Sequence, residues 1–245
     1  MQAVILAAGK GARLQPYTDS MPKCMIPVKG KPLLFHALDC LSEAGKIEEV
    51  IIVCGYKGEV IREQAGASWK GMKLTYLVNG AYEKTNNVYS LYLVKDHIHA
   101  DCLLLECDLF YRQDVIDAVM EGEADCNILV SPYDKQTMDG TVVMTDGDKV
   151  RELIIKAHQD PGRDYSRAYK TVNLYQFREA FFNKKLMPAL ELYVNTGNLQ
   201  SYYELVLGSL IYYRNDDIRI KIVETSRWYE IDDGADYERA EQSLL

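Results

Sequence analysis

The chain has 245 residues, of which 48% are hydrophobic, so it is long enough to bury a substantial core. The net charge is −8, and the sequence contains no cluster of Lys and Arg. Nucleic acid is therefore an unexpected partner, because binding to a polyanion depends on clustered Lys and Arg. No apolar stretch reaches the length of a membrane span, and the short first strand lacks the basic flank of a signal peptide. We therefore expect a cytoplasmic protein with no membrane partner.

Strand and helix signals alternate through the first half of the chain. Residues 32–44 repeat apolar side chains at helical spacing and stop at Gly45, a good C-terminal cap, and residues 49–54 form the apolar run of a strand covered on both faces. The predicted elements are strands at 3–6, 49–54, 73–78 and 101–106, and helices at 32–44, 58–64 and 87–96. This alternation predicts a Rossmann-like, doubly wound α/β fold with a mainly parallel sheet.

The second half favours antiparallel strands separated by turn residues such as Asp146-Gly147-Asp148. Segment 157–167 is polar, contains Pro161-Gly162, and is predicted to be a surface loop or lid. The predicted elements are strands at 126–131, 141–145, 150–155, 169–174 and 219–224, and helices at 176–195, at 201–213 and from about 235. No linker, repeat or low-complexity segment divides the chain. We therefore predict a single domain over residues 1–245, whose mixed sheet carries a small antiparallel extension.

The six cysteines form no CxxC pair, and most lie in apolar strand or helix patterns. Buried free thiols are therefore expected rather than disulfides or a metal site. They are Cys24, Cys40, Cys54, Cys102, Cys107 and Cys126.

The first strand runs into a glycine-rich turn that is suited to hold a polyphosphate. Gly9 and Gly11 let backbone N–H groups approach phosphate oxygens, while Arg13 and Lys23 supply positive charge. Other phosphate loops fit badly, because a Rossmann fingerprint needs a small residue in place of Leu14 and a Walker loop needs Gly-Lys-Ser/Thr. A glycine turn that only links a strand to a helix would leave the two cations unexplained.

Carboxylates follow two strands at the ends where ligands bind in α/β sheets. Asp108 ends an apolar strand, and Asp232 and Asp233 end a short strand that begins at Trp228. Because Mg²⁺ needs only one or two carboxylates besides phosphate oxygens and water, we expect Asp108 and Asp232 to hold it. The alternative is that each acid caps the following helix, which is the preferred interpretation for Asp233. For Asp108 we prefer metal binding, since an unpaired charge in an apolar strand is costly.

Asn86, Asn87 and Ser90 combine two amides and a hydroxyl at the predicted start of a helix. Amides suit the edge of a nucleobase because each carries a donor and an acceptor on one planar group. One of the two asparagines is also expected to cap the helix. These side chains are therefore candidates for binding a base.

The N-terminal segment resembles the signature of the sugar-nucleotide-type nucleotidyltransferases. The matching pattern is Leu6-Ala7-Ala8-Gly9-x-Gly11-x-Arg13, followed after eight residues by Pro22-Lys23. The run Asn86-Asn87-x-Tyr89-Ser90-Leu91-Tyr92 is similar to an element of the choline-phosphate and phosphonate cytidylyltransferases, where it lies beside the pyrimidine. Four further segments support this branch: 138–143, 169–173, 202–204 and 228–233. Together they most resemble the cytidylyltransferases that activate 2-aminoethylphosphonate, with the bacterial phosphocholine enzymes close behind.

The resemblance implies the nucleotide-diphospho-sugar transferase fold, with a nucleotide-binding half at about 1–125 and an acceptor-binding half at about 126–245. The implied nucleotide-binding residues are Leu6, Ala7, Ala8, Gly9, Gly11, Asn86, Asn87 and Ser90, and the implied catalytic residues are Arg13 and Lys23. In the family, acids that match Asp108 and Asp232 hold the catalytic magnesium. The acceptor-binding candidates are Asp139, Tyr169, Asn173, Trp228, Tyr229 and Glu230, of which the acids and aromatic rings suit an ammonium group. The aromatic pair has an alternative role in the core.

We expect a nucleotidyltransferase of EC 2.7.7 type that transfers CMP from CTP to a small zwitterionic acceptor and releases pyrophosphate, with Mg²⁺ as cofactor. The favoured acceptor is 2-aminoethylphosphonate. The first alternative is a CTP:phosphocholine cytidylyltransferase that makes CDP-choline, and the second is a sugar-1-phosphate nucleotidyltransferase. A nucleotide sensor without catalysis has little need for two metal acids. The sequence indicates no oligomeric state.

Overall fold

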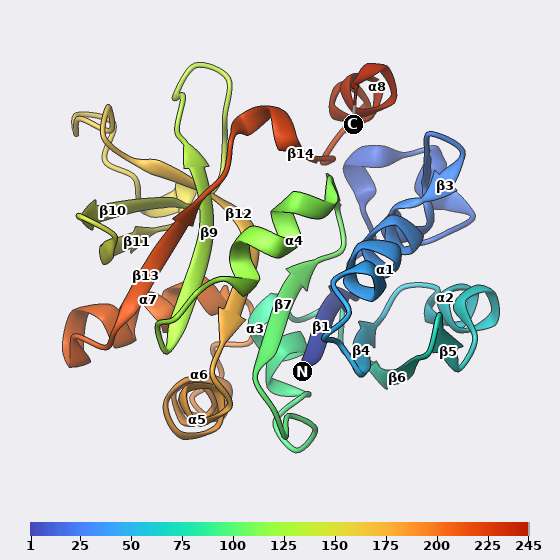
Figure 1. Ribbon diagram of the computed structural model, residues 1–245, viewed down its shortest axis with the longest axis horizontal. Coiled ribbons are helices and arrows are strands. Elements are labelled where there is room, and N and C mark those ends of the chain that lie inside the picture. Colours follow the sequence, from blue (N-terminus) through green and yellow to red (C-terminus); the bar gives the residue numbers. More distant parts are fainter. Residues whose placement is uncertain (245) are drawn as a thin grey trace.

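The computed structural model describes residues 1–244, in which one ten-stranded sheet is covered by helices on both faces (Figure 1). Its strands are β1 (Gln2–Ala7), β4 (Glu49–Cys54), β5 (Ser68–Trp69), β6 (Met72–Val78), β7 (Cys102–Glu106), β9 (Cys126–Pro132), β10 (Val142–Asp146), β11 (Lys149–Ile154), β12 (Tyr169–Phe177) and β13 (Ile218–Ile222). Two small pairs lie outside this sheet: β2 (Pro27–Val28) with β3 (Lys31–Pro32), and β8 (Leu109–Tyr111) with β14 (Trp228–Glu230). The helices are α1 (Leu33–Glu43), α2 (Gly58–Ala65), α3 (Asn87–Tyr92), α4 (Gln113–Met120), α5 (Glu179–Phe181), α6 (Met187–Asn195), α7 (Tyr203–Arg214) and α8 (Gly234–Gln242), and a π-helical segment, Phe182–Leu186, joins α5 to α6.

The strand order is β10-β11-β13-β9-β12-β7-β1-β4-β6-β5. In the first half, β1 pairs in parallel with β4 and β7, and β4 pairs in parallel with β6. The second half joins through β12, which runs antiparallel between β7 and β9, while β13 is parallel to β9. The predicted doubly wound, mixed α/β fold is confirmed. The antiparallel part extends further into the sheet than predicted, because β12 lies within the sheet rather than at its edge.

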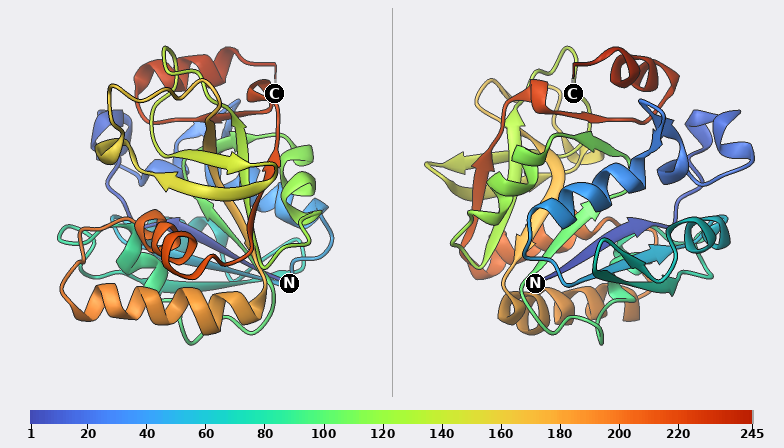
Figure 2. Two further views of the ribbon diagram at one scale, coloured as in Figure 1. Left: turned by 90° about the vertical axis from the view of Figure 1, so that its left-hand side faces the viewer. Right: turned by 45° about the vertical axis from the view of Figure 1, so that its right-hand side comes forward.

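Both faces of the central strands are buried, which explains their apolar runs. Val4 and Leu6 face a core that also contains side chains of α3, α6 and α7, whereas Ala3 and Ile5 face a second core under α1, α2 and α4. Successive side chains of a strand alternate between the two faces, so one short sequence supplies both cores. Figure 2 shows the helices on the two sides of the sheet.

Most predicted elements agree with the structure to within two residues at either end. The helix predicted from residue 176 begins at Glu179, because β12 continues to Phe177 and pairs there with Cys102 of β7. The helix predicted for 87–96 ends at Tyr92 and is followed by turns. Neither β8 nor α4 was predicted, although Val115 and Val119 lie four residues apart on the buried side of α4.

All six cysteines are free, as predicted, and four of them are buried. The segment predicted as a loop, 157–167, consists of turns and irregular chain after a 3-10 helix at Lys156–His158. Within residues 1–244, no helix combines the length and apolar character needed to cross a bilayer.

Candidate active site

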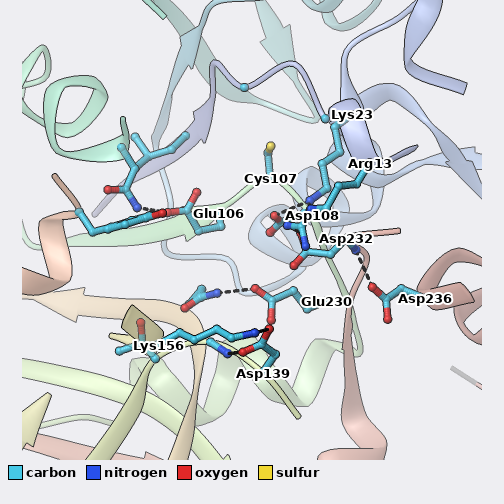
Figure 3. A pocket seen from close by; sticks show the side chains of 18 of the residues that line it. Arg13, Lys23, Glu106, Cys107, Asp108, Asp139, Lys156, Glu230, Asp232 and Asp236 are labelled. Atoms are coloured by element: carbon cyan, nitrogen blue, oxygen red, sulfur yellow. Dashed lines mark hydrogen bonds and ion pairs between the residues drawn. The ribbon is translucent and has the colours of Figure 1, made fainter. Parts of the chain in front are cut away.

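A cavity of about 1330 Å³ opens beside the carboxyl ends of β1 and β7, and residues of both halves of the chain line it (Figure 3). The predicted site residues that line it are Leu6, Ala8, Gly9, Gly11, Arg13, Lys23, Asn86, Asn87, Ser90, Asp108, Asp139, Asn173, Trp228, Tyr229, Glu230 and Asp232. Two predicted residues do not line it: Ala7 is buried in the core, and Tyr169 lines a separate cavity of about 650 Å³. The structure therefore brings together most of the residues selected from the sequence.

At Gly11, the glycine-rich turn has a backbone conformation that suits a phosphate loop. Gly11 has a φ of 63°, a left-handed conformation that glycine adopts without strain. A Cβ atom on Gly11 would also lie 3.0 Å from Cβ of Lys23 and 3.1 Å from Cγ2 of Thr18. The missing side chain thus lets Lys23 pack against the turn. Gly9 is exposed, with no atom near the position of an added Cβ, so its backbone is open to a ligand.

Two cations and two carboxylates meet at one end of the cavity (Figure 3). The Lys23 Nζ atom lies 2.8 Å from Oδ2 of Asp108 and 2.9 Å from Oδ1 of Asp232, and Arg13 Nη2 lies 2.9 Å from the same Asp232 oxygen. The pairing of β8 with β14 brings the two acids together, because Ile231 N donates to Asp108 O at 3.0 Å. We call Arg13, Lys23, Asp108 and Asp232 the charged tetrad.

The charges within the tetrad control its protonation. Burial by itself lowers the pKa of Lys23, but the neighbouring charges of Asp108 and Asp232 outweigh it and raise this pKa above its ordinary value. Burial raises the pKa of Asp232, yet Lys23 and Arg13 reverse that effect and hold it below the usual range. Lys23 is therefore cationic and Asp232 anionic at neutral pH.

The residues at this end fit a magnesium ion. Asp108 Oδ1 is buried and has no hydrogen-bond partner among the described residues, so a hard oxygen ligand is available there. Residues 1–244 contain no group of three or more His, Cys, Asp or Glu side chains able to hold a metal. An ion held by Asp108 and Asp232 would thus depend on phosphate oxygens and water for its remaining ligands, which is usual for Mg²⁺.

Two carboxylates, the half-buried Glu106 and the buried Glu204, face one another across Asn87. Asn87 Nδ2 lies 3.3 Å from an oxygen of each, and Asn87 Oδ1 accepts a hydrogen bond from Tyr203 N at 3.0 Å. Burial raises the pKa of Glu204 to about 7. Burial, with the charges of Asp108 and Glu204, raises the pKa of Glu106 well above its ordinary value. Asn87 is therefore committed to holding these two acids, which the sequence did not suggest.

Glu230 is half-buried and has a cationic partner. Its Oε2 lies 3.1 Å from Nζ of Lys170, and its Oε1 accepts a hydrogen bond from Asn173 Nδ2 at 2.8 Å. Asn173 has a φ of 56° in an irregularity of β12, and this geometry turns its side chain toward Glu230. Lys170 Nζ lies 5.8 Å from the Trp228 ring, so the protein's own ammonium group occupies that aromatic face.

Asp139 and Asp233 also have partners within the protein. Asp139 forms an ion pair with Lys156 at the rim of the cavity. Asp233 caps α8 by accepting hydrogen bonds from Ala235 N and Asp236 N, and Asp236 completes a capping box. The capping interpretation of Asp233 is confirmed. Of the neighbouring acids Asp232 and Asp233, only Asp232 belongs to the charged tetrad.

Asn86 and Ser90 already make hydrogen bonds of their own. Asn86 Oδ1 accepts from Asn87 N at 2.8 Å and caps α3, so one of the two asparagines caps as predicted. Ser90 is buried, and its Oγ accepts from Asn79 Nδ2 at 3.1 Å. Asn86, Asn87 and Ser90 line the cavity, and their contact with a base stays a prediction.

Among the charged residues that line the cavity but were not selected from the sequence are Glu106, Lys170 and Glu204. Glu106 is the last residue of β7 and lies two positions before Asp108, so it stands at the same carboxyl end of the strand. Lys170 and Glu204 interrupt apolar segments, and a charge in such a segment needs a partner or a function. These patterns could have revealed all three.

The model of the protein family described as "Nucleotidyl transferase" matches residues 2–207. The chain belongs to the nucleotidyl transferase family. This result confirms the resemblance carried by residues 6–23 and identifies an enzyme of the nucleotidyltransferase class.

Two relatives within this family differ in nucleotide and acceptor. The CMP-5'-(3-aminopropyl)phosphonate synthase of Streptomyces rubellomurinus is 33% identical over 242 residues, which cover 98% of this chain and 38% of that relative. The chain thus spans less than half the length of that protein. The UTP–glucose-1-phosphate uridylyltransferase of Haloferax volcanii is 34% identical over 188 residues, covering 75% of this chain and 74% of the relative.

A solved structure supports the cytidylyltransferase branch. The CTP:phosphocholine cytidylyltransferase of Streptococcus pneumoniae superposes on this nucleotidyltransferase with a TM-score of 0.75 at 27% identity, covering 98% of this chain and 97% of that chain. Together with the aminopropylphosphonate relative, it confirms the similarity to cytidylyltransferases that residues 86–92 indicated.

Proposed function

We propose that this nucleotidyltransferase transfers CMP from CTP to a small phosphonate or phosphate that carries an amine, with 2-aminoethylphosphonate as the favoured acceptor. One observation carries the proposal: the tetrad and a set of buried carboxylates line the same cavity. Cations at one end suit phosphates, and carboxylates beyond them suit an amine. The aminopropylphosphonate and phosphocholine relatives support this choice, since each acts on a substrate with both groups.

The reaction needs positioning and charge rather than a general base. An anionic oxygen of the acceptor forms a bond to the α-phosphorus of CTP, the bond from that phosphorus to the bridging oxygen breaks, and pyrophosphate leaves with the electron pair. Lys23, which is held at the centre of the tetrad, would contact the α-phosphate and the acceptor. Arg13 is more exposed and would contact the departing β- and γ-phosphates. Both cations would exchange a contact with Asp232 for phosphate oxygens.

Asp108 and Asp232 would hold Mg²⁺, for which their free oxygen and their position beside Lys23 are suited. When bound there, the ion would neutralise charge on the phosphoryl oxygens. The protein's own part is to hold both acids close together, which the ion pairs of Lys23 with Asp108 and Asp232 do.

A second candidate is a sugar-1-phosphate nucleotidyltransferase, because the uridylyltransferase relative is 34% identical to this chain. The buried acids favour the first candidate, since an uncharged sugar brings hydroxyls but no countercharge to them. Pyrophosphate release should be measured for four NTPs, each crossed with 2-aminoethylphosphonate, phosphocholine, phosphoethanolamine and glucose-1-phosphate. We expect the highest kcat/KM with CTP and 2-aminoethylphosphonate. A preference for UTP and glucose-1-phosphate would instead establish the second candidate.

A further inference from the structure

The carboxylates of the cavity differ in whether a cation already balances them. The Lys170 ammonium and the Asn173 amide occupy the two oxygens of Glu230, and Lys156 pairs with Asp139. Both acids were the sequence-based candidates for the amine of the acceptor. Since their charges are matched within the protein, an incoming ammonium would have to displace a lysine from either one.

Glu106 and Glu204 are in the opposite situation. No Lys or Arg of residues 1–244 forms an ion pair with either, and their only shared side-chain contact is the uncharged Asn87 amide. Glu204 is 6% exposed, so water does not readily stabilise its charge. Two neighbouring carboxylates, one buried and one half-buried, are costly to ionise when neither has an ion-pair partner, and the protein retains them where they line the cavity.

A fully buried hydroxyl beside these acids also has no partner. Tyr203 is 0% exposed, and its Oη makes no hydrogen bond in the described part of the chain. The backbone N of Tyr203 donates to Asn87 Oδ1 at 3.0 Å, so this residue lies beside the amide that contacts both acids. Its free hydroxyl is a donor of the kind that stabilises a charged carboxylate.

We infer that Glu106 and Glu204, held by Asn87, form the subsite that binds the ammonium group of the acceptor; this inference rests on the proposed function. It replaces Glu230 and Asp139 in that role. Lys170 and Asn173 then become positioning residues that fix Glu230 at the wall of the cavity.

The spacing from the reaction centre sets the length of the acceptor. Only Cys107 separates Glu106 from Asp108, and the turn at residues 107–108 keeps the subsite next to the charged tetrad. Figure 3 shows Glu106 and Asp108 on either side of Cys107. A short chain of two or three carbons between the phosphorus and the nitrogen fits that separation. A primary ammonium has three N–H donors for the two carboxylates, whereas a trimethylammonium group has none, so the subsite selects primary amines.

The test compares two phosphonates of equal size. In 2-aminoethylphosphonate an ammonium stands where propylphosphonate has a methyl group, so the ratio of their affinities reports the amine alone. Calorimetric titration should show that the wild type binds the aminophosphonate at least about tenfold more tightly, as expected for a charged hydrogen bond. Glu106→Gln and Glu204→Gln should each reduce this preference by about tenfold and leave the affinity for propylphosphonate within about twofold.

The matched controls are Glu230→Gln, whose acid already has a lysine partner, and Glu63→Gln on the exposed side of α2. Both should keep the preference for the amine. If Glu230→Gln removes the preference for the amine while Glu106→Gln keeps it, the assignment is overturned. Thermal melting of each variant shows whether that variant is folded. If Glu204→Gln does not fold, the Glu106→Gln variant decides.

The same experiment separates the subsite from the reaction. Should the wild type bind both phosphonates equally, or neither, the subsite is refuted whatever the enzyme transfers. Should it bind the aminophosphonate selectively and yet release no pyrophosphate from CTP with it, the subsite stands and the proposed reaction fails.

Discussion

The two ends of the cavity handle charge in opposite ways. At the tetrad, two cations face two carboxylates within 2.9 Å, and each charge has an opposite neighbour. Around Asn87, two carboxylates share one neutral amide, and burial raises the pKa of both. The first end is held by ion pairs before substrate arrives, whereas at the second end neither carboxylate has an ion-pair partner among the described residues, and the acceptor can supply one. The difference indicates which ligand group each end accepts.

Under the proposed function, the paired charges of the tetrad would let phosphates bind while each acid keeps a partner. Lys23 has two acidic partners, so a phosphate that replaces one of them leaves the other in place. Glu106 and Glu204 have no second charged partner of this kind, and their ionisation lowers stability until an ammonium group binds. The experiments below test this contrast, beginning with the largest expected effect.

Removing the central cation of the tetrad should have the largest effect. Lys23→Ala should lower kcat by about 10³, because it removes a positioned charge from the transition state and leaves Asp108 without its ion-pair partner. Arg13→Ala should change both KM and kcat, since Arg13 would hold the leaving pyrophosphate. Steady-state kinetics with varied CTP separate the two. A Lys23→Ala enzyme with a normal kcat and a raised KM would contradict the assigned role.

The end of the cavity around Asn87, where no ion pair balances the carboxylates, should make the free energy of unfolding depend on pH. Glu204 has a pKa of about 7 in the folded protein, against 4.5 as its ordinary value. Because the folded state binds this proton more tightly, the stability it contributes is complete below pH 4.5 and is lost as the pH rises through 7. Relative to Glu204→Gln, the wild type should lose about 3 kcal/mol between pH 4.5 and pH 8.

Denaturant unfolding of both proteins at the two pH values measures this difference. Several titratable or charged groups face Glu204 and must be the same in both proteins: Glu106, Lys170, Tyr175, Tyr203 and Glu230. If the difference in unfolding free energy between the wild type and Glu204→Gln does not change with pH, the folded protein does not raise the pKa of Glu204. The expected pattern makes Glu204→Gln more stable at pH 8 and less selective for the amine.

Changing the acids of the tetrad tests whether they hold a metal or only partner Lys23. Asp108→Asn and Asp232→Asn should each lower kcat by about 10² while the protein stays folded, because each loses a charged ligand without losing volume. The Mg²⁺ concentration that gives half of the maximal rate should rise in both variants. Asp233→Asn is the matched control, since Asp233 caps α8 and Asn is also a good cap. Near-normal activity with an unchanged Mg²⁺ dependence in Asp108→Asn would assign that acid to Lys23 alone.

The fold and the phosphate end were predictable because their signals are local. The run 49–54 marks a doubly covered strand within six residues, and the turn from Gly9 to Arg13 carries its chemistry in one short stretch. The strands β8 and β14 have three residues each and pair across more than a hundred positions, so neither contains a usable period. Their pairing nevertheless brings Asp232 beside Asp108, which the position of both acids at strand ends had predicted without naming the partner strands.

The acceptor end was predicted less well because partners there come from distant elements. Glu230 was selected as a free acid, yet Lys170 of β12 neutralises it, and no local pattern shows which of several lysines would do so. Asn87 was selected to bind a base, yet its amide contacts Glu106 of β7 and Glu204 of α7. Sequence identified the right residue types in the right cavity, whereas the assignment of partners required the packing of helices on the sheet.

Base selection should give the smallest effect, since the residues near the start of α3 already have partners within the protein. We expect CTP to be preferred over UTP by about tenfold in kcat/KM, the worth of one buried polar group left unpaired with the wrong base. Asn86→Ala should narrow this preference, and it should also weaken the cap of α3, because Asn86 Oδ1 accepts from Asn87 N. Asn86→Asp is the matched variant: it keeps a capping oxygen but cannot donate to a base. If Asn86→Asp discriminates between CTP and UTP as well as the wild type does, Asn86 is a cap only and the base is selected elsewhere.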